Sequence, residues 1–331
     1  MSDIPATPSA PNQHTADGAV AIGQPLPTAA GTEAGGLDQP MPTGGDTPAG
    51  RSAWRLALQS FLDNKLGIAG LVLVIAIVLF CFVGPLVYHT NQISPNAAQI
   101  NLPPSARHPL GTDYVGFDVL GRLMAGGQSS IEIGLAVAVV ATLFGVLWGA
   151  ISGYLGGVVD SVLMRIVDII LAIPSIFLFI YLATVFKPTV GLLIVVVSAL
   201  SWVGPARLVR GEALSLRVRE YVQAVRVMGG HSTRIVLRHI VPNTVGTIVV
   251  NATFQVADAI LILATLSFLG FGLPPPAATW GGMLSEGTNY LYDGYWWAVY
   301  PAGIIIALTV IAFNFIGDAL RDALEVRLQR R

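Results

Sequence analysis

Residues 220–243 read EYVQAVRVMGGHSTRIVLRHIVPN and separate two long apolar stretches of the chain. The first part predicts a short amphipathic helix, because four apolar residues recur at positions i, i+3, i+4 and i+7 and therefore share one face. These residues are Tyr221, Ala224, Val225 and Met228. Glu220 suits the positive end of the helix dipole, and Gly229 with Gly230 predicts where the helix ends.

The second part of this segment predicts another helix, which leads into the next apolar stretch. Ser232 or Thr233 can cap its start, and it is expected to run to His239 and to meet Pro242. The composition fits a solvated positive loop, a helix lying on anionic lipid and a helix docked on a soluble partner. We discard a DNA-binding helix-turn-helix, because the turn is held between membrane spans.

The rest of the chain has the composition of a membrane protein. Of its 331 residues 53% are hydrophobic and only 11% are charged, whereas soluble domains carry about 25% charged residues. A helix that crosses a bilayer needs about 20 apolar residues. Six stretches meet this length: 66–88, 131–151, 162–186, 189–208, 245–271 and 296–316. We therefore expect an all-α membrane protein with six transmembrane helices.

Two of these spans contain residues that interrupt a helix. Pro174 lies inside the third span, where neighbouring helices tolerate a kink. Trp202, Gly204 and Pro205 weaken the end of the fourth span. The fourth is therefore the weakest of the six.

Lysine and arginine concentrate on one side of this topology, as is the rule for cytoplasmic loops. With six spans both termini lie on the same side, which carries all but three of the 18 Lys and Arg residues. The exceptions are Arg107, Arg122 and Lys187. We predict a multi-pass protein with both termini in the cytoplasm, an external segment 89–130 and a cytoplasmic loop 209–243.

Residues 1–50 form a separate part of the chain. They contain eight Pro, eight Gly, five acidic residues and no Lys or Arg. Such a segment does not bury enough apolar surface to offset the entropy lost on ordering, so we expect a disordered cytoplasmic tail. The transmembrane domain is then 51–331.

Local patterns predict contacts of the second and third spans. Gly145, Gly149 and Gly153 repeat every four residues, a spacing that lets a neighbouring helix approach closely, and we favour this packing role over a hinge.

Two further pairs of residues predict polar contacts at the ends of these spans. Ser129 and Ser130 are expected to cap the start of the second span. Arg165 and Asp168 are three residues apart near the cytoplasmic end of the third, and we expect them to form an ion pair.

The sequence lacks the motifs of nucleotide binding and catalysis. A P-loop needs Gly-Lys-Ser/Thr, and neither Lys65 in DNKLG nor Lys187 in FKPT stands in such a run. The patterns HExxH, CxxC and GxSxG do not occur. We expect no catalytic residue and no metal site, and an intramembrane hydrolase would need a positioned base that the sequence does not indicate.

Polar residues follow one face of the fifth span. Asn251, Gln255 and Asp258 recur at i, i+4 and i+7, and Thr244 and Thr265 extend the stripe. An acid that faces lipid costs about 2.5–3.5 kcal/mol, so this face is expected to point inward. Packing between helices and a water-filled path are both open roles. We favour the path, because the segment before this span could move it.

The segment 220–243 resembles the cytoplasmic loop of bacterial ABC importer permeases, which reads EAA, three residues, Gly, nine residues and I-x-L-P. Gln223, Ala224 and Val225 stand at the EAA positions, followed by Gly229, His239, Val241 and Pro242. Ala224, Gly229 and Pro242 match this pattern. The other four positions depart from it.

Three further segments are similar to the dipeptide, oligopeptide and nickel branch of this family. They are HPLGTDYVGFDVLGRL at 108–123, LSFLGFGLPPPAATWGGML at 266–284 and GDALRDALEVR at 317–327. Phe117 departs from the branch, which usually has a basic residue there. The resemblance runs from about residue 55 to the C-terminus.

This resemblance implies a type I ABC importer permease fold in the bacterial inner membrane, with a coupling helix between spans four and five. In the family two permeases form the pathway, two cytoplasmic ATPases bind ATP and Mg, and an external binding protein delivers the solute. This chain would then bind membrane lipid but no cofactor and no nucleic acid, and would carry peptides or related small solutes.

The resemblance also assigns roles to residues. The residues implied to couple to the ATPase are Glu220, Tyr221, Gln223, Ala224, Val225, Met228, Gly229 and Pro242. The polar stripe of the fifth span, rather than the resemblance, makes Asn251, Gln255 and Asp258 the candidates for the translocation path. The alternative is a gradient-driven secondary transporter, which would use an ionisable residue such as Asp258 at mid-membrane.

Overall fold

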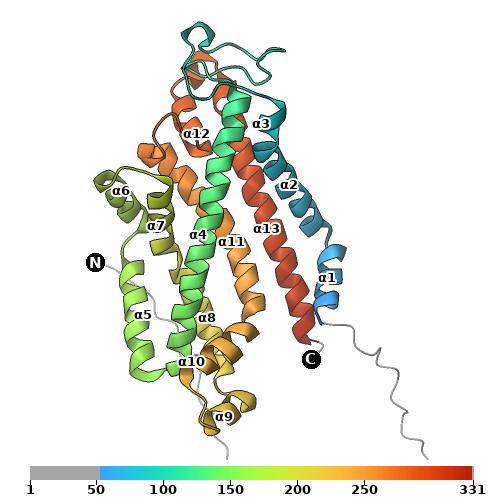
Figure 1. The fold of residues 1–331 in the computed structure, drawn as a ribbon, viewed down its shortest axis with the longest axis vertical. Helices are drawn as coiled ribbons and strands as arrows, with labels where there is room; N and C mark the ends of the chain where they lie inside the picture. Colours follow the sequence, from blue (N-terminus) through green and yellow to red (C-terminus); the bar gives the residue numbers. More distant parts are fainter. Residues whose placement is uncertain (1–52, 330–331) are drawn as a thin grey trace, which may run out of the picture. The chain divides into compact units, whose positions relative to one another are not determined.

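The computed structural model describes residues 53–329, and every regular element in this range is a helix (Figure 1). The first eight helices are α1 (Ala53–Asp63), α2 (Lys65–Phe82), α3 (Gly84–Val87), α4 (Val119–Leu155), α5 (Gly157–Ala172), α6 (Ser175–Val185), α7 (Val190–Ser201) and α8 (Val203–Leu216). They are followed by α9 (Glu220–Val227), α10 (Ser232–Ile235), α11 (Val245–Leu266), α12 (Trp280–Thr288) and α13 (Tyr300–Gln329). The expected tail, 1–50, lies outside the described residues.

Six short turns complete the described elements. They are η1 (Ala97–Gln99), η2 (Val236–Ile240), η3 (Val241–Asn243), η4 (Ser267–Phe271), η5 (Leu291–Asp293) and η6 (Trp296–Ala298). Of these, η2 and η4 are π-helical and the others are 3₁₀ turns.

Helix α4 runs the length of the helical bundle in Figure 1, with different elements at its two ends. Helices α9 and α10 lie at one end, here named the α9 end. Helices α3 and α12 lie toward the other, together with the segment that precedes α4. Helix α1 and the last turns of α13 lie toward the α9 end, so the described chain starts and finishes at the same end of the bundle.

Among the described residues, up to six helical stretches could cross a membrane. Four qualify alone: Lys65–Phe82, Val119–Leu155, Val245–Phe271 and Trp296–Leu324. Two more qualify as bent pairs: Gly157–Ala172 with Ser175–Leu182, and Val190–Ser201 with Val203–Leu216. These stretches overlap the six expected spans, so the helical membrane architecture is confirmed.

Both bends lie where the sequence indicated a weak helix. The third stretch bends by 79° where Pro174 separates α5 from α6, because proline has no N–H to continue the ladder. The fourth bends by 41° at Trp202, between α7 and α8. The expected kink at Pro174 is confirmed, and the fourth stretch continues past its expected end to Leu216.

Helix α4 begins earlier than expected because Asp118 caps it. The Asp118 Oδ1 accepts a hydrogen bond from the Gly121 N–H at 2.8 Å. Residues 119–130, expected in the external segment, are therefore helical. The capping role expected for Ser129 and Ser130 is wrong, since both lie inside α4. Ser130 Oγ instead accepts a hydrogen bond from the Trp280 N–H at 3.3 Å.

The same carboxylate fixes the segment before α4. Its Oδ2 accepts a hydrogen bond from the Tyr88 hydroxyl at 2.8 Å and lies 2.9 Å from His108 Nδ1. Asp118 therefore joins the end of α3, the segment between α3 and α4, and the start of α4.

A second polar cluster lies one turn further along α4, around Arg122. The Arg122 Nη1 donates to Pro276 O at 2.7 Å, and its guanidinium lies 4.4 Å from the centre of the Phe117 ring. The carboxylate of Asp113 is 3.9 Å from Arg122 Nε. Burial raises the pKa values of Asp113 and Glu286, which line the same small cavity as this arginine.

Helices α4 and α8 pack backbone against backbone along the glycine stripe. A Cβ atom at Gly145, Gly149 or Gly153 would lie 2.5, 2.2 or 2.6 Å from a carbonyl oxygen of the other stretch. The carbonyl groups belong to Trp202, Ala206 and Arg210, respectively. Any larger side chain would force the two helices apart, so the predicted packing role is confirmed.

Two ion pairs join α5 to α8. Arg210 Nε and Nη2 donate to the two carboxylate oxygens of Asp160 at 2.5 and 2.6 Å. Arg207 Nη2 donates to Asp168 Oδ1 at 2.5 Å. The expected ion pair between Asp168 and Arg165 is therefore wrong. Both residues lie on α5, but the arginine that pairs with Asp168 comes from the neighbouring helix α8.

We predict that Gly149→Ala destabilises the protein, because the new methyl group would meet the Ala206 carbonyl oxygen. Overpacking of this kind costs about 1–3 kcal/mol. The midpoint of thermal aggregation in detergent should fall measurably below that of the wild type. The control is Gly211→Ala on α8, where a Cβ meets nothing within 4 Å. Equal midpoints for the two variants would contradict the tight contact.

Candidate functional site

Helix α9 rests on the bundle through Val222 and Val225. Val222 is buried, and Val225 packs beside it in one apolar cluster. The other buried members of this cluster come from α4, α8, α10 and η2: Val146, Ala150, Val209, Ala213, Ile235, Val236 and Ile240. Val225, expected on a face that docks a partner, thus faces the protein's own core. It does so because it lies three residues after Val222 and shares its face.

The opposite face of α9 is exposed and largely apolar. The side chains of Tyr221, Val227 and Met228 are 43%, 87% and 77% exposed. Ala224 is exposed on the same helix. Glu220 and Gln223 are exposed beside them. We name these six residues the docking face, because exposed apolar surface rimmed by polar groups is typical of a protein interaction site.

Gly229 ends α9 in a Schellman motif. Its φ is +82°, a left-handed conformation that favours glycine. The Gly230 N–H donates to Val225 O at 3.0 Å, and the Gly229 N–H donates to Arg226 O at 3.1 Å. These are the two hydrogen bonds of the motif, so the helix end expected from the sequence is confirmed.

A continuous series of short turns connects α9 to α11. Helix α10 passes directly into η2 and then into η3, which contains the exposed Pro242. The capping role expected for Ser232 or Thr233 is wrong: His231 is the residue before the helix, and no side chain caps it. Ile235, Val236 and Ile240 instead hold these turns by packing in the same apolar cluster as Val222.

Polar contacts hold together the helix ends that carry α9. Ser152 Oγ donates to Asp160 Oδ1 at 2.5 Å, so this carboxylate joins α4, α5 and Arg210 of α8. Arg217, just after α8, donates from Nη1 to Gly153 O at 3.3 Å. These contacts hold the end of α8, from which the chain continues into α9, against α4 and α5.

The polar stripe of α11 is divided between three environments. Asn251 lines a cavity near the α9 end, and Gln255 is buried, with 7% exposure. Asp258 is exposed, as are Leu261 and Thr265 on the following turns. The structure thus separates the three candidate path residues, although their spacing puts them on one side of the helix.

Asp258 lies at the centre of the apolar stretch Val245–Phe271. Its neighbours Ala257 and Ala259 are buried, each with 1% exposure, so the carboxylate points away from the chain's own bundle. An uncovered acid at this depth in lipid would cost about 2.5–3.5 kcal/mol. This face of α11 therefore requires a polar or proteinaceous neighbour.

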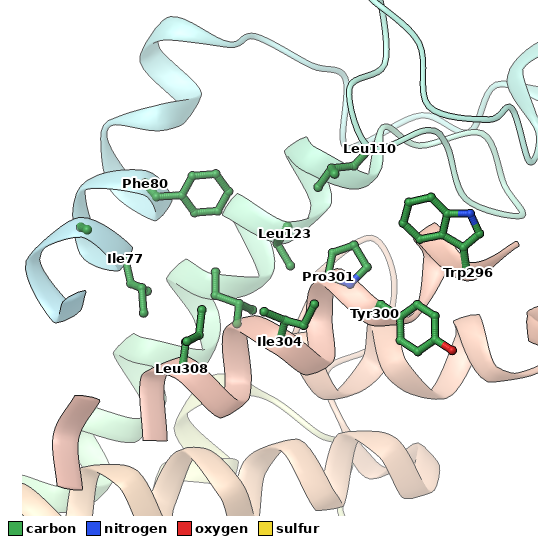
Figure 2. A pocket seen from close by; sticks show the side chains of 11 residues that line it. Ile77, Phe80, Leu110, Leu123, Trp296, Tyr300, Pro301, Ile304 and Leu308 are labelled. Carbon is green, nitrogen blue, oxygen red and sulfur yellow. The ribbon is translucent and has the colours of Figure 1, made fainter. Parts of the chain in front are cut away.

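Two cavities of about 470 Å³ each differ in chemistry. One, between α2, α4 and α13, is lined by apolar side chains such as Ile77, Phe80 and Leu123, with Trp296 and Tyr300 at one side (Figure 2). Its lining offers no charged group. The other, between α8, α11 and α13 near the α9 end, is lined by Glu212, Thr247, Asn251 and Arg321 among apolar residues.

The sequence prediction missed residues of α9 and residues of the polar cavity between α8, α11 and α13. Val222 and Val227 were not singled out, although Val222 and Val225 are three residues apart and so share the inner face. Glu212 and Thr247 belong to helices far apart in the sequence, and nothing in either segment indicates that they meet.

Two family models match parts of this chain. Residues 145–330 match the family described as the binding-protein-dependent transport system inner membrane component. Residues 52–104 match the N-terminal transmembrane domain of oligopeptide transport permease C.

Individual relatives cover most of the chain. The oligopeptide transport system permease protein OppC of Bacillus subtilis is 40% identical over 84% of this chain and 91% of its own. OppC of Escherichia coli is 41% identical over 83% and 92%. The dipeptide transport system permease protein DppC of B. subtilis is 37% identical over 85% and 86%.

A solved structure of the MetNI methionine ABC transporter, in an inward-facing conformation, has a chain 20% identical to this one. The match covers 62% of this chain and 96% of that chain, with a TM-score of 0.49. The family assignment follows from the sequence matches: this chain belongs to the family of inner-membrane components of binding-protein-dependent transport systems.

Proposed function

We propose that this chain forms one half of the transmembrane pathway of an ATP-driven ABC importer of dipeptides or oligopeptides. The relatives named above support the substrate class, since they are oligopeptide and dipeptide permeases. The observation that carries the coupling role is the docking face of α9, which presents Tyr221, Val227 and Met228 outside the bundle.

The docking face fits a groove on a cytoplasmic ATPase. An amphipathic helix that lays its apolar face in a groove is a common mode of protein recognition. Of the three roles open from composition, docking on a protein accounts for the exposed Val227 and Met228 at the tip of α9. A displacement of α9 would be passed on through Val222 to α4 and α8, and through η2 and η3 to α11.

The partners follow from this role. Two ATPases would bind ATP and Mg and supply hydrolysis, while this chain binds no cofactor. A second, homologous permease would cover the exposed face of α11, either directly or across a water-filled path that Asp258 would line. A binding protein would deliver the solute at the end of the bundle where α12 lies.

We infer that the α9 end lies in the cytoplasm of a bacterium, with the spans in the inner membrane and in contact with lipid. Arg210, Arg217 and Arg226 lie in α8, α9 and the link between them, and positively charged residues favour the cytoplasmic side. Helix α1 and the end of α13 lie toward the same end, which supports cytoplasmic termini. Membership of a binding-protein-dependent family argues against the gradient-driven alternative.

The test of this function is transport by the reconstituted complex. Proteoliposomes that hold both permeases and both ATPases should take up radiolabelled peptides only when ATP and the binding protein are present. The controls omit either ATP or the binding protein. Peptide uptake by this chain alone, driven by an ion gradient, would contradict the proposal.

Ala224→Arg should abolish association with the ATPase. The arginine would place a charge inside the docking face without altering a membrane span, so we expect normal insertion but about tenfold or greater loss of ATPase affinity in a pull-down titration. Gln59→Arg is the control, because it adds the same charge at an exposed position of α1. Unchanged affinity in Ala224→Arg would show that α9 does not dock the ATPase.

Asp258→Cys should react with a water-soluble maleimide in at least one nucleotide state of the complex, in a Cys81→Ser background. Ala259→Cys, which is buried, and Val72→Cys, on the exposed apolar face of α2, are controls that should stay unreactive. If Asp258→Cys stays unreactive in every state, this face of α11 packs against protein rather than a water-filled path.

A further inference from the structure

The cavity near the α9 end combines a size suitable for a small solute with charged and polar walls. Its volume is about 470 Å³, within the range of roughly 300–1,000 Å³ that is typical of ligand pockets. Glu212 comes from α8, Thr247, Val250 and Asn251 from α11, and Arg321 from α13. The equally large cavity of Figure 2 offers only apolar side chains and the edges of Trp296 and Tyr300. The two cavities therefore differ in the polarity of their walls and not in size.

Oxygen acceptors gather on one side of this cavity. Thr247 Oγ1 donates a hydrogen bond to Glu212 Oε1 at 3.2 Å, which orients the carboxylate. Asn251 follows Thr247 by four residues and lies on the same face of α11. Its Oδ1 is buried without a hydrogen-bond partner among the described residues. A buried acceptor that lacks a partner costs free energy, so a change of side-chain conformation that brings this oxygen to a donor in the cavity is favoured.

A primary ammonium group matches these acceptors. It carries three N–H donors and no acceptor, and its hydrogen bonds to a carboxylate are charge-assisted. Glu212 would supply the carboxylate, while Thr247 and Asn251 would supply neutral oxygens. Arg321 already interacts with other groups of the chain, and we assign it no bond to the solute. Its positive charge disfavours cations that carry no anionic group, such as metal ions. A peptide also carries a carboxylate.

The position of the cavity connects it to the coupling segment. Thr247 lies in the first turn of α11, which begins directly after η3. A movement of α9 that is passed through η2 and η3 would therefore shift Thr247 against Glu212 of α8. The acceptor set would be assembled in one state of the importer and separated in the other.

We propose that this cavity binds the protonated amino terminus of a peptide on the α9 side of the membrane, with Glu212 as the ammonium ligand and Asn251 and Thr247 as supporting acceptors. This proposal rests on the proposed function. It adds a solute site that selects a free amino terminus within this chain, at the point where α11 responds to α9.

The test is protection of a cysteine in the cavity wall. Val250→Cys in the Cys81→Ser chain, assembled with its partner subunits in nanodiscs, is labelled with a water-soluble maleimide. Tri-alanine should slow the labelling, whereas N-acetyl-tri-alanine, which lacks the ammonium group, should not. Adding Glu212→Gln should raise the tri-alanine concentration for half-protection by about tenfold or more, since a charge-assisted bond is lost. Gln retains the shape of the side chain and the contact with Thr247.

The matched control is Asp63→Asn, which removes an exposed acid of α1 outside the cavity and should leave protection unchanged. Equal protection by both peptides, no protection by either, or full protection in Glu212→Gln would each overturn the proposal. The uptake assay separates this result from the proposed function. ATP-dependent uptake without amine-dependent protection refutes the site alone, and amine-dependent protection without uptake refutes the peptide importer alone.

Discussion

The contact between the backbones of α4 and α8 is the constraint on which the α9 end depends. Three glycines, one per turn, let the helices approach until no side chain fits between them. This contact brings Val146 and Ala150 of α4 beside Val209 and Ala213 of α8, and together they form the apolar surface on which Val222 rests. Without the close approach Val222 would lose this surface, and α9 would no longer be held against the bundle.

The features that the sequence predicted well are those set by neighbours along the chain. Apolar length gave the six spans, the four-residue glycine repeat gave the tight contact, and Gly229 gave the end of α9 with the left-handed backbone it needs. Each depends on residues within a few turns of one another. The early start of α4 belongs to the same class, since Asp118 is an ordinary helix cap. It was missed because the span was judged from apolar length alone.

The features that the sequence could not give depend on which helix lies beside which. Asp168 has an arginine three residues away, yet it pairs with Arg207 because α8 lies against α5. The polar stripe of α11 has one helical phase, yet its residues meet a cavity, the bundle interior and open surface in turn. Val225 shows the same limit within α9: the pattern identified an apolar residue but not which of two apolar faces the core would cover. Helical periodicity specifies which residues share one side of a helix. The environment of each of these residues is set by the elements that pack beside it at that height along the helix.

The exposed Asp258 has a consequence for how a cell makes this protein. A newly synthesised chain that nothing covers on this face would hold a carboxylate against lipid at the centre of a span, at a cost of about 2.5–3.5 kcal/mol. That cost corresponds to roughly a hundredfold bias against the fully inserted state. In the proposed pair the second permease would remove this cost, so subunit assembly and membrane integration would become one thermodynamic step. An unpaired copy would then be the form that membrane quality-control proteases recognise, which would favour synthesis of the two proposed subunits in matched amounts.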